Sequence, residues 1–427
     1  MIGKLGKSDF VKSVAVLLTG TLIAQIIAYV VYSLVARAYY SAEDLAEFGI
    51  YTRVSGFVAA IATARYEQSL PIARQDLHAF YLYRLSFRIA LVVLTATGII
   101  GLVYFLLKPF DPGNFAFLVM TVASTYFAVW INLGTNWSIR KKAFSRISRQ
   151  RVINSLVTNG LRWLFAVFSW GGLGIIFATL IGSFVSGLVF IREYFNIRRF
   201  YSGYAAPKRL RVLSREYKQF PLVNLPHVLL DLGVDVIVAL LITDLFGEKE
   251  FGFYSHSYAM VRLPLAIVGQ SIGQVFYNKC SEMVNKGQSV LPLLLKTYKT
   301  LFLLAIIPFT LLFFYGEELF TFAFKEKFRE SGRLSEIMAP WLMLNFILSP
   351  VSGIPLIFGR QRPAFIIGII SAAGQLVIYG VLPFVLPKEW VTMTSFLYAT
   401  SAYQSVLLLI NFFLYIRFVK EGRRNRV

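Results

Sequence analysis

The chain has 427 residues, of which 57% are hydrophobic and only 15% are charged, and its formal net charge is +21. A composition this apolar excludes a water-soluble protein, because too few polar side chains remain to cover its surface. The single cysteine, Cys280, excludes an internal disulfide and a multi-cysteine metal site. The positive charge does not imply nucleic acid as a partner, because membrane proteins concentrate Lys and Arg in their cytoplasmic loops.

Apolar runs long enough to cross a bilayer recur along the whole chain. A helix crosses the hydrocarbon in about 20 residues. The first run, residues 14–35, is longer than the roughly 7–15 residues of a signal-peptide core, so we expect an uncleaved first helix. The sequence therefore predicts an all-α integral membrane protein with about 12 transmembrane helices. The predicted spans are 14–35, 48–64, 89–107, 115–134, 152–170, 171–191, 220–243, 252–276, 298–315, 337–358, 363–385 and 391–416.

The distribution of basic residues predicts the orientation of these spans. When alternate connections are assigned to the side of the amino terminus, that side carries 32 of the 43 Lys and Arg residues, and the other side carries 8. Cytoplasmic loops carry such an excess, so both termini are expected in the cytoplasm. The three remaining residues, Arg53, Arg162 and Arg262, lie inside spans.

The middle of the chain suggests a division into two halves. The longest cytoplasmic connection, 192–218, falls at mid-chain, and its Gly203, Ala205, Ala206 and Pro207 are typical of a linker. Residues 47–51 (EFGIY) and 250–254 (EFGFY) open the second and eighth spans and form a faint repeat. Because six is even, such repeats would share one orientation. We therefore expect an N-lobe at 1–205 with spans 1–6, and a C-lobe at 206–427 with spans 7–12.

Motifs that would indicate catalysis are absent from the sequence. The chain has no GxxxxGK[ST] phosphate loop and no HExxH zinc motif, so we expect neither an enzyme nor a cofactor or metal. The longest outer connection, roughly Gly316 to Glu336, is short for an extracellular catalytic domain.

Arginines inside the predicted spans are the main candidates for a binding site. A charge at the bilayer centre costs roughly 2.5–3.5 kcal/mol on insertion scales, so such residues commonly have a function. Arg162 and Arg262 lie deep in their predicted spans, where guanidinium groups would suit a diphosphate; the alternative is a buried ion pair with Asp231 or Asp235. Arg53 lies nearer the outer end of its span and could instead extend to the interface.

Two further sets of polar residues allow more than one interpretation. His227, Asp231 and Asp235 share one helix face and form either a site for H+ or Na+ that couples transport to an ion gradient, or a static ion pair. Arg65, Arg84 and Arg88 lie near inner helix ends, where they either guide an anionic lipid head group or only anchor the helices.

Several short motifs, in a fixed order, resemble a known family. The motifs in the first half are 20–25 (GTLIAQ), 36–37 (AR), 41–44 (SAED), 48–49 (FG), Tyr51 and 64–67 (ARYE). Those in the second half are 245–247 (LFG), 251–254 (FGFY), 262–264 (RLP) and 272–277 (IGQVFY). With these motifs the sequence resembles, over nearly the whole chain, Wzx-type polysaccharide flippases of the multidrug/oligosaccharidyl-lipid/polysaccharide exporter superfamily.

The resemblance implies two six-helix lobes around a central cavity that opens alternately to each side. It implies a cargo too, an undecaprenyl-diphosphate-linked oligosaccharide moved from the inner to the outer leaflet of a bacterial cytoplasmic membrane. Expected partners are this lipid, membrane lipids and other polysaccharide-assembly proteins. The alternatives are a multidrug or cation exporter of the same superfamily, a membrane polysaccharide polymerase or ligase, and a scaffold subunit without transport.

Overall fold

The computed structural model describes residues 2–107, 111–201 and 207–424. These residues form helices joined by turns, and no strand occurs among them. Their packing divides the chain into two compact units, which we call the first unit (Met1–Val236) and the second unit (Ile237–Val427).

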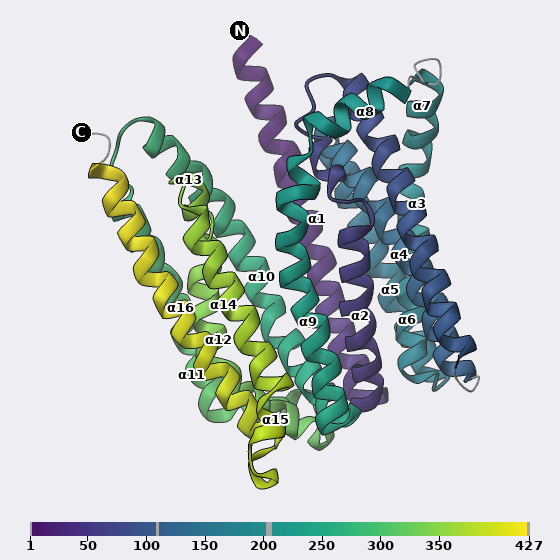
Figure 1. Cartoon of the computed structure of the whole chain (residues 1–427), viewed down its shortest axis with the longest axis vertical. Helices are drawn as coiled ribbons and strands as arrows, with labels where there is room; N and C mark the ends of the chain where they lie inside the picture. The colour runs from purple at the N-terminus through teal and green to yellow at the C-terminus, as the bar shows by residue number, and fades with distance from the viewer. Residues whose placement is uncertain (1, 108–110, 202–206, 425–427) are drawn as a thin grey trace. The chain divides into compact units, whose positions relative to one another are not determined.

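The first unit is an antiparallel bundle (Figure 1). Six long helices run alternately up and down, and two shorter helices follow at the end where the bundle begins. The long helices are α1 (Ile2–Tyr39), α2 (Ala42–Ala62), α3 (Asp76–Leu106), α4 (Pro112–Arg140), α5 (Phe144–Val167) and α6 (Gly171–Gly187). The shorter helices are α7 (Ile191–Tyr201) and α8 (Pro207–Glu216), and α9 (Leu225–Phe246) begins after them.

Local sequence explains where several of these helices begin. Ser41 and Asp44 form a capping box at the start of α2, in which each side chain bonds the backbone N–H of the other residue. The same Asp44 carboxylate accepts the N–H of Gly172 at 2.8 Å, which joins α2 to the turn between α5 and α6. That turn needs left-handed backbone, which Gly171 adopts with φ +58°.

The second unit has five long helices of its own, α10 (Glu248–Asn285), α11 (Leu291–Phe324), α12 (Arg329–Leu348), α14 (Gln361–Gly380) and α16 (Met393–Arg424). Short helical segments, α13 (Ile354–Ile357) and α15 (Leu382–Val385), lie at the ends of α14. Near the start of α12 its backbone touches α11, where a Cβ built on Gly332 would lie 2.4 Å from the carbonyl oxygen of Gly316. Only glycine permits this close crossing.

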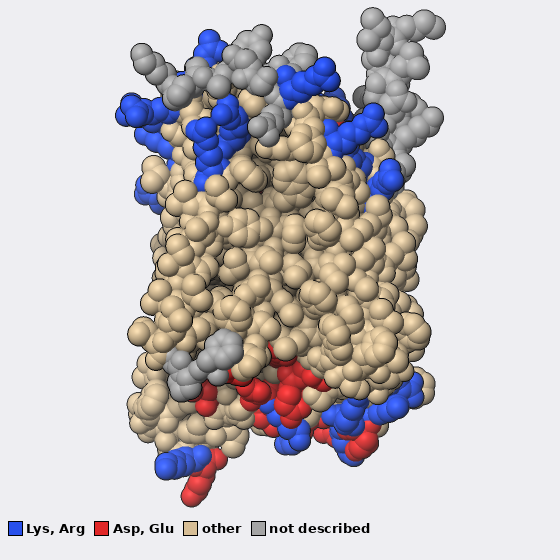
Figure 2. Space-filling model, turned by 90° about the vertical axis from the view of Figure 1, so that its right-hand side faces the viewer, with Lys and Arg blue, Asp and Glu red and all other residues tan. Residues whose placement is uncertain are grey.

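The all-α membrane fold predicted from the sequence is confirmed. Each predicted span falls on a helix of at least 17 residues, and nine helical segments in the described part of the chain are long and apolar enough to cross a membrane. The helix α5 is not among the nine because polar residues such as Arg151, Asn154 and Arg162 recur along it. On the face drawn in Figure 2, Lys and Arg predominate at one end, acidic and basic residues lie together toward the other end, and a broad band between them shows neither.

Two predicted connections are wrong. The expected outer loop from Gly316 to Glu336 is mostly helical, because α11 continues to Phe324 and α12 starts at Arg329. The expected linker at 192–218 contains α7 and α8; Pro207 begins α8, whereas Gly203, Ala205 and Ala206 lie outside the described residues. Short polar helices of this kind become stable only by packing one face on a neighbour.

The boundary between the compact units lies at Val236, inside α9, and the residues from Pro207 to Val236 pack with the first unit. The predicted division at 205/206 follows the count of six spans per half, not the packing, and it stays a prediction.

Candidate functional site

Arg53 and Asp235 form an ion pair in the first unit, at the middle of their helices. Arg53 Nε lies 3.3 Å from Asp235 Oδ1, and another guanidinium nitrogen donates to the carbonyl of Gly49 at 3.1 Å. The Arg53 side chain is 9% exposed, whereas that of Asp235 is 43% exposed. The structure thus pairs a residue predicted to bind diphosphate with one predicted to couple to an ion.

The position of Arg53 along its helix differs from the sequence prediction. The capping box starts α2 at Ala42, earlier than the predicted start at residue 48, so Arg53 lies at mid-helix and not near the outer end. A guanidinium at this depth requires an ion partner or a polar cavity, because the hydrocarbon core cannot solvate it. Asp235 is that partner.

Asp231 lies one helical turn before Asp235 on α9, and its side chain is exposed. It forms no ion pair with a described residue. The backbone of His227 belongs to α9, but its side chain lies outside the part of the chain that the structure describes. Of the two members of the predicted ion-coupling set whose side chains the structure describes, Asp235 contacts a basic residue and Asp231 does not.

Arg162 is half-buried among aromatic side chains of the first unit. Its guanidinium carbon lies 4.8 Å from the ring centroid of Phe48 and 5.7 Å from that of Tyr32. Thr179 of α6 accepts a hydrogen bond from it at 3.2 Å, and Tyr40 donates to the Arg162 carbonyl at 2.9 Å. Helices α1, α2 and α6 thus position this one cation.

The surroundings of Arg162 leave part of its hydrogen-bonding capacity unused. Within the described ranges no carboxylate forms an ion pair with it, and its buried Nε has no hydrogen-bond acceptor there. A guanidinium carries five N–H donors. Aromatic faces attract its positive charge but do not supply the oxygen acceptors that those donors need. The described residues therefore do not form the buried ion pair that was the alternative prediction for Arg162.

The depth of Arg162 also differs from the prediction. Because α5 runs from Phe144 to Val167, Arg162 is five residues from its C-terminal end, about 8 Å along the helix axis. Phe48, which it contacts, is next to Gly49, whose carbonyl binds Arg53. Two guanidinium groups therefore approach consecutive residues of α2.

Arg262 lies in the second unit, on α10, and is exposed. It donates a hydrogen bond to the Tyr258 hydroxyl at 2.6 Å and lies 5.2 Å from the centroid of that ring, which in turn stacks on Trp341. None of the described carboxylates forms an ion pair with Arg262.

Arg65 is held in a strained turn directly after α2. Ala64 and Arg65 both have left-handed backbone, with φ values of 48° and 63°. Arg65 Nε donates to the Asn224 side chain at 3.0 Å. Another guanidinium nitrogen of Arg65 lies 3.8 Å from Glu67 Oε1. Asn224 ends a π-helical turn, Phe220–Asn224, which leads into α9. This turn therefore fastens the start of α9 to the end of α2.

The other two predicted lipid-entry arginines lie in the first half of α3. Arg84 is half-buried with its guanidinium 5.7 Å from the Phe80 centroid, and Arg88 is exposed. Neither forms an ion pair with a described residue.

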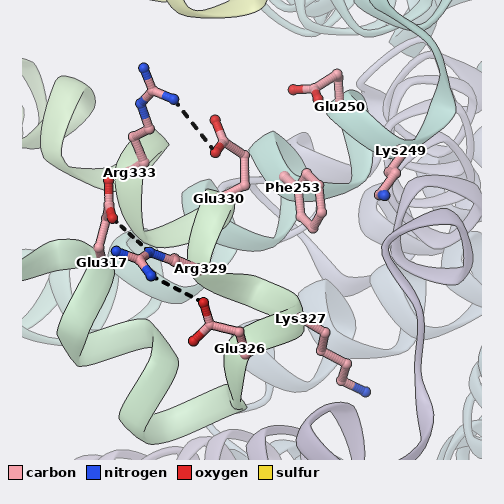
Figure 3. Close-up of a pocket in the computed structure, with 9 residues that line it drawn as sticks. All are labelled: Lys249, Glu250, Phe253, Glu317, Glu326, Lys327, Arg329, Glu330 and Arg333. Carbon is pink, nitrogen blue, oxygen red and sulfur yellow. Dashed lines mark hydrogen bonds and ion pairs between the residues drawn. The ribbon is translucent and has the colours of Figure 1, made fainter.

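A separate pocket of about 480 Å³ lies in the second unit (Figure 3). Arg329 bridges Glu317 and Glu326 at 2.9 and 3.1 Å, and Arg333 lies 3.9 Å from Glu330. Four basic and four acidic side chains line it, so its formal charge is zero and it does not suit a diphosphate. The lining residues are Lys249, Glu250, Phe253, Glu317, Glu326, Lys327, Arg329, Glu330 and Arg333.

Sequence reasoning missed the residues that surround the candidate arginines. Tyr32, Tyr40 and Thr179 had no signal of their own, because tyrosine and threonine are common in membrane helices. Phe48 belonged to a repeated pentapeptide, but the repeat did not suggest a contact with Arg162. Among the described residues, no group of three or more His, Cys, Asp or Glu could hold a metal ion.

Known proteins show where this fold occurs. The profile of a family described as "Polysaccharide biosynthesis protein" matches residues 46–333. No curated protein sequence matches the chain.

Solved structures match nearly the whole chain. The inward-facing conformation of a multidrug resistance MATE family transporter of the MOP superfamily is 15% identical, with a TM-score of 0.70 over 96% of this chain and 100% of that one. The inward closed conformation of the lipid II flippase MurJ is 15% identical, with a TM-score of 0.71; the match covers 96% of this chain and 90% of MurJ. A MOP superfamily transporter from Pyrococcus furiosus is 14% identical, with a TM-score of 0.55; the match covers 95% of this chain and 96% of that transporter. At these identities the likeness shows the fold alone.

Proposed function

Because the chain belongs to the polysaccharide biosynthesis protein family, we propose that it is a flippase for an undecaprenyl-diphosphate-linked oligosaccharide repeat unit. It moves this lipid from the inner to the outer leaflet of a bacterial cytoplasmic membrane, by alternating access. Arg162 of the first unit binds the diphosphate, and Arg262 of the second unit is a separate candidate for the same role; the sugars stay hydrated, and the polyprenyl tail remains in lipid. The observation that carries the proposal is Arg162, which no described carboxylate neutralises.

The chemistry of Arg162 supports an anionic ligand. The rings of Phe48 and Tyr32 hold the guanidinium plane in place, so a phosphate would meet donors whose orientation is already set. Charge-assisted hydrogen bonds of this kind contribute roughly 1.5–3 kcal/mol each. A membrane potential that is negative inside would add about 2.3 kcal/mol per charge per 100 mV to outward movement of the anionic head.

The test is leaflet exchange of a fluorescent polyprenyl-diphosphate glycan by the reconstituted protein. We expect Arg162→Gln to lower the exchange rate roughly 10- to 100-fold, the value of one charge-assisted contact, with Arg262→Gln acting in the same direction. Arg162→Lys should be intermediate, because the charge remains but the planar donor set is lost.

Arg329→Gln is the matched control, because Arg329 is an arginine of the second unit that is already paired with Glu317 and Glu326. Its exchange rate should stay near that of the unmodified protein. If Arg162→Gln and Arg262→Gln both flip the lipid at the normal rate with normal protein levels, the diphosphate site is refuted.

The Arg53–Asp235 pair supports a coupling step. When H+ or Na+ binds Asp235, it competes with Arg53 for the carboxylate; when the diphosphate binds Arg53, it competes with Asp235 for the guanidinium. The two ligands therefore favour each other, and thermodynamic linkage makes the effect reciprocal, typically 5- to 150-fold. The 43% exposure of Asp235 leaves its carboxylate open to an ion.

Asp235→Asn tests this exchange. We expect polyprenyl-diphosphate affinity to rise with H+ or Na+ concentration in the unmodified protein and to be independent of the ion in this variant. Asp231→Asn is the control, since Asp231 pairs with no described basic residue and its variant should keep the ion dependence. An unchanged ion dependence in Asp235→Asn would mean that the pair is static.

Two alternatives make different predictions. A multidrug or cation exporter needs unneutralised carboxylates at its site, whereas among the described candidate residues two cations, Arg162 and Arg262, have no carboxylate partner and one acid, Asp231, has no basic partner. The same proteoliposomes should therefore not move an organic cation. A polymerase or ligase needs a catalytic set on a long outer connection, whereas the longest outer connection that the sequence predicts, Gly316 to Glu336, is short and mostly helical.

A further inference from the structure

The short helix α8 is fixed to the first unit by one face. Leu213 is 4% exposed, and Tyr217, which follows the helix, is 7% exposed; both belong to the core that α3 and α4 form. The Tyr66 hydroxyl donates to the Ser214 carbonyl at 2.9 Å. Glu216, the acid at the end of α8, lies 3.6 Å from Arg74. These contacts determine which side of α8 faces outward.

The outward face of α8 is basic. Arg209, Arg211 and Arg215 are exposed, and none forms an ion pair with another described residue. Val212 lies among them and is 63% exposed. Glu216, the acid of α8, is paired with Arg74 and not with these arginines. A surface with several unneutralised cations and an exposed apolar side chain suits an anionic, partly apolar partner.

The position of α8 on α3 brings this surface close to the lipid boundary. The apolar side chains of Phe87, Leu91 and Val92 are exposed on α3, as expected of a surface that faces lipid tails. Phe87 follows Asp76, the first residue of α3, by eleven residues, or about 16 Å along the axis. Leu213 and Tyr217 share a core cluster that includes Ala79 and Phe80, near the start of α3, so α8 lies at head-group level.

We propose that the outward face of α8, formed by Arg209, Arg211, Val212 and Arg215, binds anionic phospholipid head groups of the membrane leaflet at that end. Charge complementarity supplies the attraction, and the lipid tails lie against the exposed apolar side chains of α3. The cargo takes no part in this contact, so it can be tested without the flippase proposal.

The test uses the full chain in nanodiscs that contain phosphatidylcholine and a photoactivatable phosphatidylglycerol, with cross-links mapped by mass spectrometry. Each basic residue near an anionic surface contributes about fivefold to binding. We expect the triple variant Arg209→Gln, Arg211→Gln, Arg215→Gln to lose cross-links on α8 by at least tenfold. Cross-links on Phe87 to Val92 of α3 should remain, which controls for folding and incorporation.

Two further variants separate specific binding from a change in net charge. The triple Arg→Lys variant keeps the charges and should retain the cross-links. The control variant Lys286→Gln, Arg360→Gln, Arg417→Gln removes the same number of charges from ion pairs of the second unit and should leave α8 unaffected. Equal labelling of α8 by phosphatidylglycerol and phosphatidylcholine probes, or labelling that survives the triple Arg→Gln change, would overturn the proposal; a soluble acidic partner would then be the occupant to seek.

Discussion

Glu67 is buried in the turn that follows α2, where Thr63 donates a hydrogen bond to its carboxylate. Burial raises the pKa of the Glu67 carboxyl above its usual range, and the Thr63 hydroxyl and Arg65 only partly offset this effect. The raised pKa means that the folded protein binds this proton more tightly than the unfolded chain does.

The pH dependence of stability follows from that difference. The protonated form of Glu67 favours folding, so its contribution decreases as pH rises from about 4.3, the ordinary Glu pKa, through the raised value, and it is constant above. We expect Glu67→Gln to remove this decline. The check is thermal unfolding of the detergent-purified protein as a function of pH. A decline of the same size in the variant would show that Glu67 does not titrate as described.

At the scale of elements, the crossing of α11 and α12 depends on two glycines. A Cβ on Gly332 would lie 2.4 Å from the Gly316 carbonyl oxygen and 2.7 Å from the Glu317 Cα, and both atoms are backbone. Neither can move aside as the end of a flexible side chain could. The two helices must therefore separate if either glycine gains a side chain.

Gly332→Ala should accordingly destabilise the protein by about 1–3 kcal/mol, the usual cost of overpacking. Gly368→Ala on α14 is the matched control, because a Cβ there meets nothing within 4 Å. It should stabilise the helix by roughly 0.5–1 kcal/mol, since alanine loses less backbone entropy than glycine. Melting temperatures of the two variants should therefore shift in opposite directions, and similar shifts would contradict the close crossing.

At the scale of the whole molecule, the arrangement of charges predicts its orientation in the membrane. Lys and Arg predominate at one end of the face in Figure 2, whereas acidic residues lie among the basic ones at the other end, in agreement with the excess counted along the sequence. The positive-inside rule assigns the predominantly basic end to the cytoplasm.

Cysteine labelling can test this orientation in cells. Cys280 is fully buried, so a Cys280→Ala background removes the native thiol. On that background, Glu389→Cys, in the connection before α16, should react with a membrane-impermeant maleimide added outside intact cells. Gln288→Cys, in the connection between α10 and α11, should react only after permeabilisation. The reverse pattern would invert the topology and remove the physical basis for flipping toward the outer leaflet.

Helix number and order could be predicted because a membrane helix satisfies its own backbone hydrogen bonds and needs only a long apolar run. Helix ends were less predictable. The start of α2 depends on the capping box of Ser41 and Asp44, and this shifts Arg53 to mid-helix. Residues 192–218 read as a loop because α7 and α8 are short and polar, and α8 forms against the core through Leu213.

The sequence by itself determined that this is a membrane protein of the fold and family found, and which few charged residues lie inside its helices. Only the tertiary structure decided which of those charges are neutralised. Arg53 and Asp235 are 182 residues apart, and no periodicity links them. The rings around Arg162 come from helices that meet only when the first unit packs. Charge pairing depends on distances of a few ångströms between remote segments, whereas span formation depends on the apolar length of one segment.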